Sequence, residues 1–175
     1  MEGGTGNEAF ITQSRHYLAR EYPTKIRLAI AGLPVEDIWW RPNECCNSIG
    51  NLLLHLAGNI RQWIVAGIGG APDERDRQAE FDAREPLSTD ALLQRLDSVL
   101  KDADRVLSSI DDEALARSYT IQGRTTTGLE AVYHVVEHFS MHTGQIAYLA
   151  KLRSGRDLGF YEDAGGLATP RWEEM

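Results

Sequence analysis

The sequence predicts an all-α protein, a four-helix bundle, from three observations. Four segments of roughly 20 residues repeat apolar residues at helical spacing, no segment alternates convincingly as a strand does, and the connectors are too short or too polar to be domains. A chain of 175 residues can bury one substantial core and is short for two. We therefore expect a single domain over residues 1–175, with its core at about 7–153 and an irregular C-terminal tail at 154–175.

Capping and helix-breaking residues set the bounds of the four predicted helices. Gly32 and Pro34 end the first, and the hydroxyl of Ser48 or of Thr127 can cap the start of a later one. The leucines of the third helix make one apolar stripe with no chemistry of its own. The helices run from about Asn7 to Ala31, from Asn47 or Ser48 to about Gly67, from about Ser88 to Ser109, and from about Thr127 to Leu152.

Two connectors have distinctive compositions. The first contains Trp39, Trp40 and Pro42, and we expect burial of its aromatic rings to order it. The second runs from Pro72 to Pro86, and nine of its fifteen residues are charged without any apolar stripe. We interpret most of these charges as those of a solvated linker, although loops of this length are uncommon and often lie near a functional site, so substrate contacts are expected here first.

Composition excludes several classes of function. The net charge of −8 repels phosphate backbones, so nucleic acid is not an expected partner. No apolar run approaches the roughly 20 residues of a membrane-spanning helix, and the N-terminal residues do not resemble a secretion signal, so we expect a cytoplasmic protein without a membrane role. Cys45 and Cys46 are adjacent, which disfavours a disulfide between them, and we expect two free thiols that are not metal ligands.

Three of the five histidines, His134, His138 and His142, lie four residues apart in the fourth predicted helix. At about 100° per residue, its apolar residues fall within an arc of about 120°. This predicted buried stripe consists of Leu129, Val132, Val135, Val136, Phe139, Ile146 and Ala150. His138 and His142 lie at its margin with Gln145, whereas His134 lies farther out because each step of four residues drifts by about 40°. Glu137 points toward solvent.

The second predicted helix also carries a polar row beside its apolar face. His55 shares this row with Ser48, Asn59 and Gln62. Histidines at i and i+4 can share one metal ion, although in isolation such a pair is equally typical of histidines that bond backbone or water at a core edge. If the two rows meet, His55, His138 and His142 form a three-nitrogen site with open coordination positions, the pattern of catalytic metal sites.

Other chemical motifs are absent from the sequence. It contains no Glu-x-x-His, which a ferritin-like di-iron site requires, and no HExxH. Neither a GxSxG elbow nor a phosphate-binding glycine loop follows a predicted strand. The histidines are therefore the main candidates for chemistry.

These residues resemble the DinB-like family, and most closely one of its uncharacterised bacterial subfamilies. The likeness covers about Tyr17 to Leu152 and is carried by NSIGNLLLHLAGNIRQWI, VEHFSMHTGQI, WWRP and GGAPDERDRQAEFD. It implies a four-helix bundle, often dimeric, with one divalent ion, commonly zinc or nickel, held by His55, His138 and His142. Characterised relatives are transferases that join bacillithiol or a similar low-molecular-weight thiol to an electrophile, and a mycothiol-dependent isomerase of maleylpyruvate.

Our hypothesis from this sequence is a metal-dependent thiol S-transferase that acts on a small electrophile and uses a low-molecular-weight thiol cosubstrate. A metal-dependent hydrolase and a non-catalytic metal-binding helical dimer are the alternatives. Asn59, Gln145 or backbone carbonyls are expected to accept the second N–H of the ligating histidines. His134 is a candidate base, although solvation of the site's rim is the favoured role. Possible recognition groups are Trp40, Arg61 and Arg124.

Overall fold

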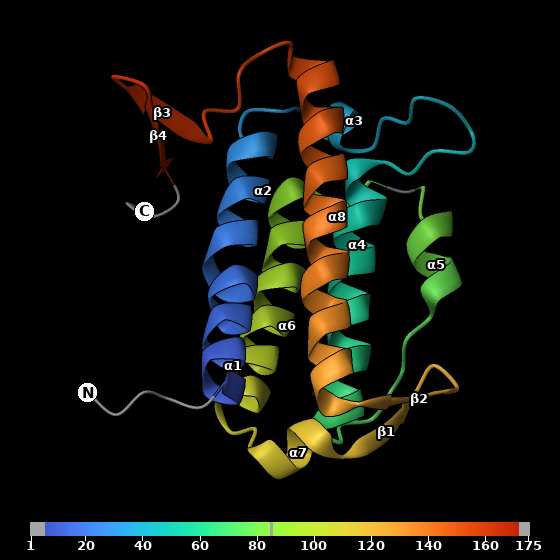
Figure 1. Cartoon of the computed structure of the whole chain (residues 1–175). Coiled ribbons are helices and arrows are strands. Elements are labelled where there is room, and N and C mark those ends of the chain that lie inside the picture. The colour runs from blue at the N-terminus through green and yellow to red at the C-terminus, as the bar shows by residue number, and fades with distance from the viewer. Residues whose placement is uncertain (1–5, 85, 172–175) are drawn as a thin grey trace.

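The computed structural model describes residues 6–84 and 86–171, and it confirms the all-α bundle (Figure 1). Each predicted helix is present, with bounds within a few residues of those expected. The first helix is α1 (Gly6–His16), continued through a π-helical turn (Tyr17–Glu21) into α2 (Tyr22–Ile30); the second is α4 (Ile49–Ile60) with a π-helical extension, η2 (Arg61–Ile68); the third and fourth are α6 (Thr89–Ser108) and α8 (Gly128–Ser154).

The direction of the helices explains the length of the charged connector. In Figure 1, α4 and α6 run in the same direction along the bundle, whereas α2 and α8 run in the opposite one. The chain must therefore return along the whole bundle between the end of η2 and the start of α6. On this return it forms a short helix, α5 (Arg77–Asp82), which lies against the outer side of α4.

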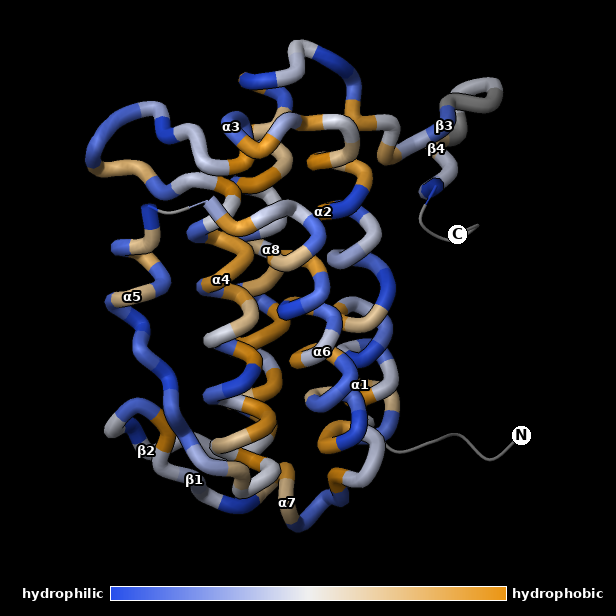
Figure 2. Tube along the Cα trace, turned by 180° about the vertical axis from the view of Figure 1, so that it is seen from behind, coloured by the Kyte–Doolittle hydropathy of each residue, from blue (hydrophilic) through white to orange (hydrophobic). Residues whose placement is uncertain are grey.

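One hydrophobic cluster joins all four long helices. In α8 the buried face differs from the predicted stripe, because Leu129 is 40% exposed whereas Ala131 and Leu149 are buried. The buried face of α8 is thus turned toward the side that carries His142, which is itself buried. Figure 2 shows that the connector around α5 is mostly hydrophilic, whereas α4 beside it carries many hydrophobic residues.

The prediction of a chain without strands is wrong in two places. The connector before α8 forms an antiparallel hairpin of β1 (Ser118–Ile121) and β2 (Arg124–Thr127), and the predicted irregular tail forms a second hairpin of β3 (Tyr161–Ala164) and β4 (Leu167–Pro170). Each strand has four residues, too few for a clear alternation. Both turns have two central residues with positive φ, as in tight hairpins, and the glycine pair of the second was a visible signal. Residues 172–175 of the predicted tail lie outside the described residues.

Two short helices complete the described part, α3 (Val35–Ile38) and α7 (Asp112–Ala116). The two tryptophans that follow α3 are half-buried rather than buried, and each contacts another part of the chain. Trp39 donates from its indole nitrogen to the carbonyl of Leu87 at 3.0 Å, and the Trp40 ring packs against the guanidinium of Arg153. Among the described residues, no helix has both the length and the apolarity needed to cross a membrane.

Candidate metal centre

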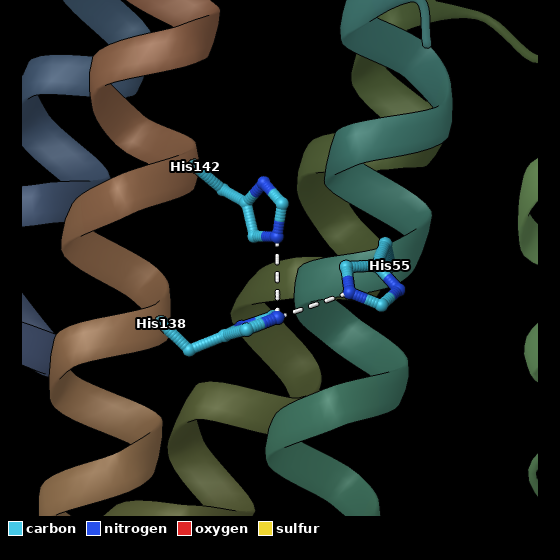
Figure 3. A group of neighbouring side chains, drawn as sticks. All are labelled: His55, His138 and His142. Carbon is cyan, nitrogen blue, oxygen red and sulfur yellow. Dashed lines mark hydrogen bonds between the residues drawn. The ribbon is translucent and has the colours of Figure 1, made fainter. Parts of the chain in front are cut away.

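Three histidine side chains from two helices converge at one point in the bundle. His55 comes from α4, and His138 and His142 come from successive turns of α8 (Figure 3). Nε2 of His138 lies 3.1 Å from Nε2 of His55 and 3.1 Å from Nε2 of His142. One nitrogen of each ring lies within 4.8 Å of the others, a spacing that allows the three to hold a metal ion.

Oxygen acceptors fix the protonation of two of these rings. Nδ1 of His55 lies 2.8 Å from Oε2 of Glu80 and 3.2 Å from Nη2 of Arg75, and we assign its proton to the nearer carboxylate oxygen; the Nδ1–H of His142 donates to Oε1 of Gln145 at 2.7 Å. Because an ionised carboxylate and an amide oxygen can only accept, both rings carry their proton on Nδ1. Their Nε2 lone pairs therefore point at Nε2 of His138, an arrangement that is favourable when a cation lies between the three nitrogens.

Glu80 lies on α5, in the connector that was predicted to be solvated. That prediction is wrong for Glu80 and for Arg75, whose side chains are only 9% and 4% exposed. Arg75 donates from Nε and Nη2 to the two carboxylate oxygens of Glu80 at 2.8 and 2.9 Å, and from Nη1 to Gln62 at 2.9 Å. Burial by itself raises the pKa of Glu80, but the hydrogen bonds from Arg75 and His55 outweigh it and hold this pKa below its ordinary value.

Side chains from α4 and from the connector before it hold α5 in place. The amide of Asn51 donates to the backbone carbonyls of Glu80 and Ala83, and Arg41 donates to Asn51 Oδ1 and to the carbonyl of Phe81. The ring of Phe81 lies 4.6 Å from that of His55, between centroids. The connector is therefore attached to the site at several points.

Burial keeps His138 and His142 in the neutral form that binds metals. Desolvation, followed by the neighbouring imidazoles and Arg75, lowers the pKa of His138 to about 3, and desolvation also lowers the pKa of His142. Three convergent imidazole nitrogens, two of them on rings whose Nδ1 faces an oxygen acceptor, fit a divalent metal ion. Three buried polar atoms near this level of the bundle have no hydrogen-bond partner among the described residues: Nδ1 of His138, Oδ1 of Asn59 and Nε1 of Trp63.

His134 lies beside the convergent group without joining it. Its ring packs against Trp63 at 4.2 Å and lies 5.4 Å from the ring of His138, between centroids. Desolvation lowers the pKa of His134, so it is neutral at neutral pH. The helical drift of the sequence thus separates His134 from His138 and His142 in the same way as the structure does.

The remaining sequence candidates have different outcomes. Gln145 contacts a histidine of the cluster as expected, whereas the amide oxygen of Asn59 bonds to no described residue. Trp40 packs on Arg153, and Arg61 and Arg124 are exposed; no contact of these three with the histidine cluster is found in the part of the chain described. Cys45 and Cys46 are free thiols, as predicted.

Sequence reasoning missed Glu80 and Arg75 because both lie in a segment without periodicity. The length of the connector was a sign of a nearby site, and the apolar Phe81 next to Glu80 was a further local signal, but neither identified Glu80 or Arg75. A surface cavity of about 340 Å³ has Gln145, the two cysteines and Tyr148 in its wall.

Comparisons with known proteins agree with this fold. Residues 6–160 match a sequence family described as a protein of unknown function, DUF1572. A conserved protein from Enterococcus faecalis is 17% identical with a TM-score of 0.69, over 83% of this chain and 97% of that one. A DinB-like protein from Bacillus cereus is 17% identical with a TM-score of 0.66, over 86% of this chain and 94% of that one.

At this identity the two solved structures establish the fold and not the reaction. None of the curated protein sequences matches the chain. The family match covers most of the sequence, including all three convergent histidines and Glu80. The chain therefore belongs to the DUF1572 family, and its fold is that of the DinB-like proteins.

Proposed function

We propose that His55, His138 and His142 hold one divalent ion, zinc or nickel, and that the protein is a thiol S-transferase acting on small electrophiles. The observation that carries this proposal is the convergence of three Nε2 atoms, two of them freed for ligation by acceptors on Nδ1. Three protein ligands leave further coordination positions open, as catalytic sites require.

The ion, when bound, would supply Lewis acidity that lowers the pKa of a low-molecular-weight thiol cosubstrate to give the reactive thiolate. The chain's own residues would position the site. Glu80 and Gln145 orient the rings of His55 and His142, and Arg75 keeps Glu80 ionised. His134 solvates the rim in this proposal, with acceptance of the thiol proton as its alternative role.

Metal content is the first test. Replacing His138 by alanine removes the central nitrogen of the group, so purified H138A is expected to contain much less zinc or nickel than the wild type by mass spectrometry. His134→Ala is the matched control, four residues away on the same helix, and is expected to keep the wild-type content. Equal metal in H138A and the wild type would remove His138 from the site.

Activity separates the transferase from its alternatives. Metal-loaded protein would be assayed with a panel of low-molecular-weight thiols paired with electrophiles, and in parallel with a panel of esters and amides. We expect thiol-dependent turnover that disappears in H138A. Turnover of the second panel alone would make the protein a metal-dependent hydrolase, and turnover of neither would favour the non-catalytic metal-binding dimer.

We further propose that the protein is a homodimer and acts in the cytoplasm. Five of the large exposed hydrophobic side chains lie on α8: Leu129, Tyr133, Met141, Tyr148 and Leu152. An apolar surface of this kind on one helix supports self-association, and two free cysteines suit a reducing compartment. Light scattering is expected to give the mass of two chains, and Tyr148→Glu is expected to shift it toward one; a wild-type monomer would contradict the dimer.

A further inference from the structure

Two rings of the histidine cluster have an oxygen acceptor at Nδ1, and the third has none among the described residues. His55 has the oxygen of Glu80 and His142 has the oxygen of Gln145, whereas Nδ1 of His138 is buried without a partner among the described residues. Oδ1 of Asn59 and Nε1 of Trp63 are likewise buried without a hydrogen-bond partner among the described residues. Buried polar atoms without partners are rare in native proteins, and three in one region require an explanation.

The three atoms belong to facing rows of two antiparallel helices. His55, Asn59 and Trp63 follow one another at intervals of four residues along α4 and η2, so they share one face. The ring of His55 packs against that of His138 at one end of this row, and the ring of Trp63 packs against that of His134 at the other. Asn59, which is 3% exposed, therefore lies between these two contacts and faces α8 at the level of His134 and His138.

Binding of a metal ion changes the hydrogen bonding that the ring of His138 requires. A neutral imidazole that binds an ion through Nε2 must carry its proton on Nδ1, and that N–H then requires an acceptor. Trp63 Nε1–H is also a donor, whereas the amide oxygen of Asn59 is an acceptor with two lone pairs. The amide oxygen of Asn59 can accept from both donors, so hydrogen bonds to it would give partners to all three orphaned atoms.

We infer that Asn59 is the positioning residue of His138: its amide oxygen accepts the Nδ1–H of His138, with the indole N–H of Trp63 as a second donor, when the ion is bound. This inference rests on the proposed metal site but not on the proposed reaction. It gives each of the three histidines its own oxygen acceptor, from Glu80, Gln145 and Asn59.

The test is zinc affinity measured by competition with a chromogenic chelator. Asn59→Leu removes the acceptor and keeps the branching at Cγ, and it is expected to weaken zinc binding by about 10- to 100-fold, the usual effect of losing such a partner. Asn59→Asp keeps an acceptor oxygen and is expected to remain close to the wild type. Thr143→Val is the matched control, since this buried hydroxyl bonds only within its own helix, to the carbonyl of Phe139.

A second readout reports on hydrogen bonding rather than affinity. In ¹H–¹⁵N spectra of the wild type, addition of zinc is expected to shift the indole N–H signal of Trp63. This signal is assigned by its loss in Trp63→Phe. The spectra of the zinc-loaded protein are also expected to show a proton on Nδ1 of His138. The shift of the Trp63 signal is expected to be absent in Asn59→Leu. This measurement also serves if Asn59→Leu folds poorly, because the wild-type spectra alone can contradict the inference.

Two sets of outcomes separate this inference from the proposed function. Wild-type zinc affinity in Asn59→Leu, or an unmoved Trp63 signal in the zinc-loaded wild type, would overturn the role of Asn59 and leave the metal proposal standing. A wild-type protein that binds zinc through this acceptor but turns over neither panel would support Asn59 while the transferase proposal fails. A wild type that binds neither zinc nor nickel would overturn both.

Discussion

Two polar segments outside the four helices, the connector at residues 69–88 and the C-terminal segment at 155–171, have opposite relations to the bundle. Both contain glycines, prolines and charges and lack helical periodicity. In the connector, Arg75 and Glu80 form a buried ion pair that reaches His55. In the C-terminal segment, Arg171 and Glu162 pair at side-chain exposures of 47% and 65%, on a hairpin that stands to one side of the bundle (Figure 1).

The path of the chain, rather than its composition, produces this difference. Because α4 and α6 run in the same direction, the connector must return along the length of the bundle. On this return it places α5 against α4, next to the histidines. The C-terminal segment follows α8, the last of the four long helices. It is fixed near its start, where Leu158 is buried and Arg156 donates to backbone carbonyls at the end of α2.

The largest effect is expected from Glu80→Ala. It would leave the buried Arg75 cation unpaired, which typically lowers the free energy of unfolding by about 3–5 kcal/mol, and it would remove the acceptor of His55, lowering zinc affinity by about 10- to 100-fold. Urea unfolding and chelator competition measure the two effects. Glu74→Ala, an exposed carboxylate of the same connector, is the control. Equal behaviour of both variants would mean that the connector is as solvated as its composition suggested.

Such an effect could not be expected from the sequence, which nevertheless predicts much of this molecule. Helix periods and caps locate the bundle, and angular position on α4 and α8 separates His55, His138 and His142 from His134. The hydrogen-bond partner of His142 can also be predicted from the sequence, because Gln145 is three residues away on the same helix. Glu80 is 25 residues from His55 in a segment without helical periodicity. Its contact with His55 is therefore visible only in the three-dimensional structure.

The second expected effect comes from the metal. A ligand that binds only the folded protein stabilises it by an amount set by its concentration, about 2.7 kcal/mol at 100 times its Kd. Zinc at that excess is therefore expected to raise the free energy of unfolding of the wild type by this amount, and a chelator to reverse the gain. In Glu80→Ala, at the same zinc concentration, the gain is expected to shrink. An unchanged gain would separate the connector from metal binding.

Two glycine substitutions test how closely the connector packs on α4. A Cβ at Gly58 would lie 1.8 Å from Oε1 of Glu80, whereas one at Gly144 on α8 would meet nothing within 4 Å. Alanine favours a helix over glycine by about 1 kcal/mol, so Gly144→Ala is expected to stabilise the protein. Gly58→Ala is expected to destabilise it by about 1–3 kcal/mol, the usual cost of overpacking, and to weaken zinc binding. A stabilising Gly58→Ala in urea unfolding would show that α5 does not hold Glu80 against α4.

The smallest effect is expected when residues 161–175 are removed. Truncation after Phe160 keeps Leu158 and Arg156 and deletes β3 and β4, whose exposed Arg171–Glu162 pair contributes little in water. The free energy of unfolding is then expected to change by less than about 0.5 kcal/mol, and zinc affinity to stay that of the wild type. The match to the sequence family covers residues 6–160 and does not include the hairpin. A decrease of more than about 2 kcal/mol in the free energy of unfolding, or weaker zinc binding, would give this segment a role in the fold comparable with that of the connector. The path of the chain alone would then no longer explain why only one of the two polar segments is buried at the site.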